Sequence, residues 1–256
     1  MTVALSRTIE VCFAPALFAY TVTKQEFIVV IIDVLRATTS FCAALDNGAA
    51  CIIPLNSIAE ARRYKEKGYL VAGERDGAKI DFADFGNSPI GFATPLIHGR
   101  AIAYTTTNGT AAIELAKSNG SIVLASFSNL GAIAGWLKQQ HKNVIILCSG
   151  WKNTFSSEDA VCAGALTLEL MKSGEYRMNG DSSFAAYDLW NAAKIDLLGY
   201  IQKASHYQRL EKMGIGDQLP FCFELNTSRC IPWWNGDAII DLASSLKVDQ
   251  ESIKGD

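Results

Sequence analysis

The chain has 256 residues, of which 49% are hydrophobic and 19% are charged, so it can bury a large core and is unlike disordered proteins. Its formal net charge of −3 argues against a broad nucleic-acid-binding surface, because binding to the phosphate backbone requires a basic field. Apolar runs such as 27–32 are far shorter than the ~20 residues that cross a bilayer, and the seven cysteines include no Cys-x-x-Cys pair. We therefore expect a soluble cytoplasmic protein with reduced thiols, no membrane span and no nucleic-acid partner.

Strands and helices are predicted to alternate along most of the chain. The first strands are expected at 8–14 and 26–32, and a helix follows from about Thr39 to Asn47. Further strands are expected at 50–55, 69–72, 101–104, 121–125 and 143–147, and further helices end at Gly68, Lys117, His141 and Lys172. This alternation predicts a three-layer α/β/α fold with a largely parallel or mixed sheet, built from repeated strand–loop–helix units.

The C-terminal third follows a different pattern. Residues 182–213 have helical periodicity, after which strands are expected at 221–225 and 230–234 and a last helix at 237–246. We expect a single α/β domain over 1–256, with two lobes meeting near 174–183 as the alternative. Large aromatic residues are more numerous here than this part needs for its own core, which favours a homodimer unless burial accounts for them: Trp190, Trp233 and Trp234.

The end of the strand at 26–32 is the most informative point of the sequence. Asp33 and Arg36 follow four β-branched residues, and Thr38 and Thr39 stand where the next helix begins. A carboxylate, a guanidinium and hydroxyls at a strand-to-helix turn can provide a metal ligand, an anion clamp and free backbone N–H groups together. The alternative is an ordinary helix entry, with a threonine N-cap and a surface arginine.

The same arrangement recurs after three other predicted strands. The segments are Gly73-Glu74-Arg75-Asp76-Gly77, Thr105-Thr106-Thr107-Asn108-Gly109-Thr110, and Cys148-Ser149-Gly150-Trp151-Lys152 with Glu158 and Asp159 at the start of the next helix. Ligands of parallel α/β sheets bind outside the carboxyl ends of the strands, so we expect one shared crevice. The alternatives are structural, since acids in the first turn of a helix are favoured by ~0.3–1 kcal/mol without any catalytic role.

The residue types favour phosphoryl chemistry with magnesium. The sequence has no P-loop, no Gly-x-Gly-x-x-Gly, no cysteine-phosphatase signature and no Asp-x-Asp nucleophile motif. Its three histidines, His98, His141 and His206, lack zinc-site spacing, and each is expected on the surface or in the core. Carboxylates and hydroxyls suit Mg²⁺, and nearby cations can stabilise the charge of a phosphoryl transition state.

Five ordered motifs resemble the 2-phosphosulfolactate phosphatase family, and a weaker similarity continues to residue 232. They are Ile32-Asp33-Val34-Leu35-Arg36-Ala37-Thr38-Thr39-Ser40, Gly73-Glu74-Arg75-Asp76-Gly77, Gly86-Asn87-Ser88-Pro89, Thr105-Thr106-Thr107-Asn108-Gly109-Thr110, and Cys148-Ser149-Gly150-Trp151 through Glu158-Asp159-Ala160-Val161-Cys162-Ala163-Gly164. The resemblance implies a magnesium-dependent phosphatase that converts (2R)-phospho-3-sulfolactate to 3-sulfolactate and phosphate, a step of coenzyme M biosynthesis. Such a substrate carries phosphate, carboxylate and sulfonate, and it needs several anion subsites.

We expect Asp33 to bind Mg²⁺ or to act as the nucleophile. Glu74 and Asp76 are further candidate metal ligands, and Arg36, Glu158 and Asp159 are further catalytic candidates. The residues expected to bind the substrate are Thr38, Thr39, Arg75, Thr106, Thr107, Asn108, Ser149, Gly150 and Lys152. The alternatives to a phosphatase are a non-catalytic binding protein and a phosphotransferase or lyase for another phosphorylated organic acid.

Overall fold

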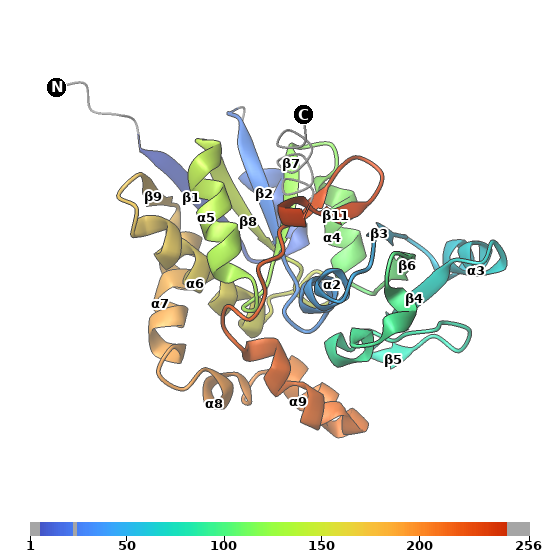
Figure 1. Ribbon diagram of the computed structural model, residues 1–256. Coiled ribbons are helices and arrows are strands. Elements are labelled where there is room, and N and C mark those ends of the chain that lie inside the picture. Colours follow the sequence, from blue (N-terminus) through green and yellow to red (C-terminus); the bar gives the residue numbers. More distant parts are fainter. Residues whose placement is uncertain (1–5, 23–24, 245–256) are drawn as a thin grey trace, which may run out of the picture.

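The computed structural model describes residues 6–22 and 25–244, and one mixed sheet forms its centre (Figure 1). Its strands are β1 (Arg7–Cys12), β2 (Phe27–Ile32), β3 (Cys51–Pro54), β4 (Leu70–Arg75), β5 (Ala78–Lys79), β6 (Ala101–Thr105), β7 (Ser121–Ala125), β8 (Asn143–Cys148), β9 (Tyr176–Asn179), β10 (Pro232–Trp234) and β11 (Ile239–Asp241). Their order across the sheet is β5-β4-β6-β3-β11-β10-β7-β2-β8-β1-β9.

Helices cover both faces of this sheet, which confirms the predicted three-layer fold class (Figure 1). The helices are α1 (Phe18–Thr21), α2 (Ala37–Asp46), α3 (Ile58–Glu66), α4 (Gly109–Ala116), α5 (Leu130–Gln140), α6 (Ser157–Met171), α7 (Asp181–Ala193), α8 (Leu197–Ile201) and α9 (Ser205–Leu210). One hydrophobic core joins the sheet to α5, α6 and α7, and a second joins its other face to α2 and α4.

The strand β2 lies inside the sheet between β7 and β8 and is buried on both faces. Val30 and Ile32 belong to the core beneath α5, α6 and α7, whereas Val29 and Ile31 belong to the core beneath α2 and α4. Successive side chains of a strand point to opposite faces, so an unbroken run of β-branched residues suits a strand covered on both sides.

The sheet consists of two parallel halves joined by an antiparallel hairpin. Strands β7, β2, β8, β1 and β9 form one half, and β3, β6 and β4 form the other. The hairpin β10–β11 pairs antiparallel with β7 on one side and with β3 on the other. These successive reversals mean that the two halves run in opposite directions, so a single straight sheet edge cannot bring all their carboxyl ends together.

Helix α4 connects the two halves near the ends of β2 and β6. It follows β6 in one half and packs on β2 in the other. Its first residue, Gly109, approaches so closely that a Cβ there would lie 2.8 Å from Asp33 Oδ2 and 2.6 Å from Ala37 Cβ. Only glycine allows this approach, because it has no side chain to collide with the start of α2.

The C-terminal segment differs from the prediction in two places. The strand predicted at 221–225 is wrong, because Pro220–Phe223 form a 3₁₀ turn that begins with proline. The helix predicted at 237–246 is wrong at Ile239–Asp241, which are strand β11, and residues 245–246 lie outside the described residues. The turn of this hairpin contains Asn235 and Gly236, a pair typical of β-hairpins that would have indicated it.

Three further predictions concern the cysteines, the large aromatic residues and membrane-spanning helices. All seven cysteines are free. Trp190 and Trp233 pack against the core beneath α5–α7, and Trp234 packs against the other core, so these aromatic residues give the expected homodimer no support. Within the described residues, no helix combines the length and the hydropathy that a membrane crossing requires.

Candidate active site

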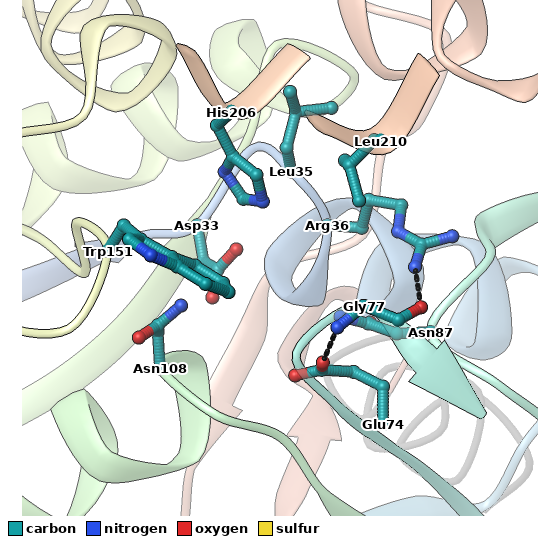
Figure 2. Close-up of a pocket in the computed structure, with 10 residues that line it drawn as sticks. All are labelled: Asp33, Leu35, Arg36, Glu74, Gly77, Asn87, Asn108, Trp151, His206 and Leu210. Atoms are coloured by element: carbon teal, nitrogen blue, oxygen red, sulfur yellow. Dashed lines mark hydrogen bonds between the residues drawn. The ribbon is translucent and has the colours of Figure 1, made fainter. Parts of the chain in front are cut away.

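The loops that follow β2, β4, β6 and β8 meet at a small cavity beneath α9 (Figure 2). Its volume of about 10 Å³ is room for roughly one water molecule. The structure therefore brings segments that are far apart in the sequence to one site, as the predicted shared crevice implies. The lining residues are Asp33, Leu35, Arg36, Glu74, Gly77, Asn87, Asn108, Trp151, His206 and Leu210.

Asp33 lies between β2 and α2, and its carboxylate points into the cavity (Figure 2). The backbone N–H of Ala37 donates to Oδ1 at 3.2 Å. The Thr38 hydroxyl accepts from the Asp33 N–H at 3.0 Å and donates to the Asp33 carbonyl at 2.9 Å, which fixes the backbone. Burial raises the pKa of Asp33 to about 6, although the Ala37 N–H and the charge of His206 oppose the shift.

Glu158 and His206 form a buried pair beside Asp33. Glu158 Oε1 lies 2.7 Å from His206 Nδ1, and the two residues are 1% and 7% exposed. Burial opposes ionisation of Glu158, but the hydrogen bond and the charge of His206 outweigh it and lower the pKa of the carboxyl group. The carboxylate holds Nδ1, so Nε2 is the ring nitrogen left for the cavity (Figure 2).

Asp159 holds two loops together. Its Oδ1 accepts from the Val34 N–H at 2.8 Å, and its Oδ2 accepts from the Gly150 N–H at 3.0 Å. Burial and the charges of Glu158 and Asp33 raise the pKa of Asp159, while the two N–H donors act against the rise. Both oxygens are engaged by the backbone, so this carboxyl group shapes the loops after β2 and β8.

Glu74 has the corresponding role at the other half of the sheet. Its Oε1 accepts from the Thr107 N–H at 2.7 Å, and its Oε2 accepts from the Gly77 N–H at 2.6 Å. The residue is only 5% exposed. It thus joins the turn after β4 to the loop after β6 on the border of the cavity (Figure 2).

Arg36 provides a buried cation at the cavity. The residue is 4% exposed, and its Nη2 donates to the Gly77 carbonyl at 3.1 Å. A guanidinium has five N–H donors in a planar fork, so one bond to a carbonyl leaves donors for an anion. Asn87, which also lines the cavity, accepts from the Tyr104 hydroxyl at 2.7 Å.

The turn after β8 forms another side of the cavity. Gly150 has a φ of +61°, and a Cβ there would lie 2.1 Å from the Thr154 carbonyl oxygen, so the turn requires glycine. The Lys152 N–H donates to Asn108 Oδ1 at 3.0 Å, which ties this turn to the loop after β6. The Ser149 N–H donates to the Ile32 carbonyl at 2.8 Å.

Several predicted residues do not line this cavity. Thr38 and Thr39 bind backbone atoms of the loop after β2, and the Thr39 hydroxyl donates to the Val34 carbonyl at 2.9 Å. Asp76 is exposed, and its carboxylate pairs with Lys152 Nζ at 2.8 Å. Three others line a separate, open pocket of about 490 Å³: Arg75, Thr106 and Thr107.

The donor set suits a weakly held magnesium ion better than a closed metal cage. In the part of the chain that the structure describes, no three His, Cys, Asp or Glu side chains are grouped to hold a metal. Mg²⁺ in phosphoryl-transfer sites is commonly held by one or two carboxylates, the substrate phosphate and water. Asp33 can serve as such a carboxylate, whereas both oxygens of Glu74 already accept backbone N–H groups.

His206 is the functional candidate that sequence reasoning missed. The sequence predicts an ordinary surface or core histidine at this position, because the three histidines lack zinc-site spacing. The only signal is its place in the weaker part of the family resemblance, 42 residues after the last strong motif ends at Gly164. The structure brings it to the cavity through α9 (Figure 2).

Comparisons with known proteins agree with the resemblance. A family model described as 2-phosphosulpholactate phosphatase matches residues 12–237. Proteins named "Probable 2-phosphosulfolactate phosphatase" include one from Pseudothermotoga lettingae that is 35% identical, with 86% of this chain and 95% of the relative covered. Another, from Synechocystis sp., is 39% identical, with 75% of this chain and 83% of the relative covered.

Proposed function

The chain belongs to the 2-phosphosulpholactate phosphatase family, and from this premise we propose that it hydrolyses (2R)-phospho-3-sulfolactate to 3-sulfolactate and phosphate with the help of Mg²⁺. The prediction of a phosphoric monoester hydrolase is confirmed at the level of the family. One observation carries the proposal for this chain: Asp33, Arg36 and His206 face the same cavity. Together they supply a carboxylate, a fixed cation and a titratable ring.

Asp33 is the proposed centre of the reaction. Its carboxylate is available either to hold Mg²⁺ beside the phosphoryl group or to attack the phosphorus as the nucleophile. Magnesium, when bound, supplies positive charge to the phosphoryl oxygens. The buried guanidinium of Arg36 supports the same role, because a cation in a site shielded from water stabilises the charge of the transition state strongly.

His206 is the proposed proton donor to the leaving group. When the P–O bond of the ester breaks, the alkoxide oxygen of sulfolactate takes the proton from Nε2 of the imidazolium. If Asp33 is the nucleophile, a water molecule then bonds to phosphorus, the bond between phosphorus and Asp33 breaks, and the water returns a proton to the ring. If Asp33 instead holds the metal, water bonds to phosphorus opposite the leaving group as the ester bond breaks, and it releases its proton to solvent. Glu158 is a positioning residue, since its bond to Nδ1 orients the ring.

Substrate binding requires the cavity to widen. A phosphate ester does not fit into about 10 Å³. His206 and Leu210, which cover the cavity, both come from the short helix α9, whereas Asp33 and Glu74 come from strand ends of the sheet. We propose that α9 shifts to admit the substrate and returns to place His206 against it.

The test is a phosphate-release assay over a panel of phosphorylated acids, with Mg²⁺ and with excess EDTA. We expect release from phosphosulfolactate with Mg²⁺ and at least ~10²-fold less in EDTA. Two results would contradict the proposal. A binding protein would bind phosphosulfolactate in EDTA and release no phosphate, and a phosphotransferase would consume it only when a second acceptor molecule is added.

A further inference from the structure

We propose that Arg209, stacked on Trp151, binds the second acidic group of the substrate, the sulfonate or the carboxylate, and thereby sets the preference for phosphate esters of acids. This inference rests on the proposed function and names the residue that gives the same site its substrate class. Arg209 lies on α9, between the cavity residues His206 and Leu210.

The guanidinium of Arg209 is held in place but lacks hydrogen-bond acceptors. Its central carbon lies 3.7 Å from the centroid of the Trp151 ring. Its Nε and Nη2 atoms are buried, and no described residue accepts a hydrogen bond from them. Buried donors of a charged group that lack acceptors destabilise a protein, so each one needs an explanation.

Stacking on tryptophan prepares a guanidinium to bind an anion. The ring takes the flat face of the cation, which leaves the N–H groups at its edge directed away from the ring. Two N–H groups in one plane match a carboxylate or sulfonate, whose oxygens accept in pairs. Nε and Nη2, the two unpaired donors, are adjacent along one edge of the fork.

The position of Arg209 connects it to the reaction cavity. Trp151 lines the cavity, and its ring centroid also lies 5.1 Å from that of His206. An anion bound by Arg209 thus lies beside the proposed proton donor, where the remainder of a small phosphorylated acid extends from its phosphate.

The exposed carboxylate near Arg209 pairs with a different cation. The charges of Lys152, Arg209 and Arg75 all lower the pKa of Asp76, so these groups share one neighbourhood. The Asp76 carboxylate pairs with Lys152 Nζ at 2.8 Å and not with Arg209.

Two other arginines stack on aromatic rings, and they show why Arg209 is different. Arg7 lies over Tyr176 but pairs with Glu175 at 3.1 Å. Arg62 lies 4.3 Å from the Phe82 centroid on exposed α3. Arg62 is thus a matched control, a stacked arginine outside the cavity.

The test compares kcat/KM for phosphosulfolactate, phospholactate and phenyl phosphate in wild type, Arg209→Gln, Arg209→Lys and Arg62→Gln. Phospholactate lacks the sulfonate, and phenyl phosphate lacks both acid groups. We expect Arg209→Gln to reduce the preference for phosphosulfolactate over phenyl phosphate by about 10- to 100-fold, chiefly through KM. Arg209→Lys should lose part of this preference, because it keeps the charge without the planar fork, and Arg62→Gln should keep it.

The comparison with phospholactate identifies which acid is bound. If Arg209 binds the sulfonate, the preference of the enzyme for phosphosulfolactate over phospholactate should be smaller in Arg209→Gln than in wild type. If Arg209 binds the carboxylate, the variant should instead lose preference for phospholactate over phenyl phosphate. Equal losses for all three substrates, or no loss for any, would overturn the proposal.

Calorimetric binding of 3-sulfolactate keeps this test separate from that of the proposed function. If the wild type releases no phosphate, the proposed function fails, but weaker sulfolactate binding by Arg209→Gln than by Arg62→Gln still supports the subsite. Equal binding by both variants refutes it. A thermal melt of each variant checks that the fold is intact.

Discussion

The loop after β2 and the end of β4 each place a buried carboxylate beside the cavity, yet the two groups are held differently. Asp33 is 6% exposed and Glu74 is 5% exposed. Glu74 accepts a backbone N–H at each oxygen, whereas Asp33 accepts one at Oδ1 only and directs its carboxylate into the cavity (Figure 2). Burial alone therefore does not identify a reactive carboxylate, and the backbone donors around it decide its role.

The neighbours Glu158 and Asp159 repeat this contrast within one helical turn. Both oxygens of Asp159 accept backbone N–H groups, whereas Glu158 binds the ring of His206. The same residue types thus serve as loop connectors and as chemical groups in adjacent positions. Substitutions of the two kinds of carboxylate should have different consequences.

The largest effect is expected for Asp33→Asn, which keeps the shape of the side chain and removes its negative charge. Phosphate turnover should fall at least ~10²-fold, because the amide can neither attack phosphorus nor hold a cation well. Steady-state kinetics measure the loss, and an unchanged circular dichroism spectrum shows that the fold is intact. Turnover close to that of wild type would contradict the role of Asp33.

The raised pKa of Asp33 should appear in the pH dependence of stability when wild type is compared with Asp33→Asn. Its pKa in the folded protein, about 6 against an ordinary 3.8, means that the folded state binds the proton more tightly than the unfolded state. As pH rises from about 3 to 8, Asp33 should therefore lower the free energy of unfolding by about 3 kcal/mol. An asparagine side chain cannot ionise, so in EDTA the Asp33→Asn variant should gain that amount relative to wild type over this range. Urea denaturation measures it, and a difference that does not vary with pH would contradict the shift.

Replacing His206 should show a dependence on the leaving group. His206→Asn should reduce hydrolysis of an alkyl phosphate by about 10²-fold and hydrolysis of 4-nitrophenyl phosphate much less, because nitrophenolate leaves without a proton. His98→Asn is the control, since His98 lies outside the cavity. Equal losses for both esters would show that His206 does not donate the proton.

A smaller effect on turnover is expected for Glu74→Gln. The amide group of glutamine places a donor opposite one of the two backbone N–H groups, so the free energy of unfolding should fall by about 1–3 kcal/mol. Turnover well below the melting temperature should fall less than in Asp33→Asn. If Glu74 binds the metal, Glu74→Gln would instead weaken the activation of the enzyme by Mg²⁺.

The smallest effect is expected for Asp76→Asn. Its exposed pair with Lys152 is of a kind that contributes little to stability, so turnover and the midpoint of Mg²⁺ activation should change by less than about threefold. A larger shift of that midpoint would support the alternative expectation that Asp76 is a metal ligand.

Sequence patterns predicted the strand ends well because those signals are local. The buried run before Asp33 predicts a strand, and Gly77 and Gly150 predict turns, each within a few residues. Which way a side chain points is decided by distant partners. Arg75, for example, binds Thr105 Oγ1 at 2.8 Å and lines the other pocket.

The pairing of distant elements was beyond the sequence patterns. The hairpin β10–β11 reverses the sheet direction and separates it into two halves, so the convergence of the loops depends on α4 rather than on one parallel edge. His206 reaches Glu158 across 48 positions of chain. The Asn235-Gly236 pair indicates the hairpin itself, but neither its place between β7 and β3 nor the pairing of His206 with Glu158 leaves a spacing that a single sequence can reveal.

The most direct test of the central claim is a crystal structure with Mg²⁺ and inorganic phosphate bound. We expect phosphate in the widened cavity between Asp33, Arg36 and His206, with the metal about 2.1 Å from the Asp33 carboxylate. Phosphate in the open pocket beside Arg75, with the metal on Asp76 and away from Asp33, would contradict it.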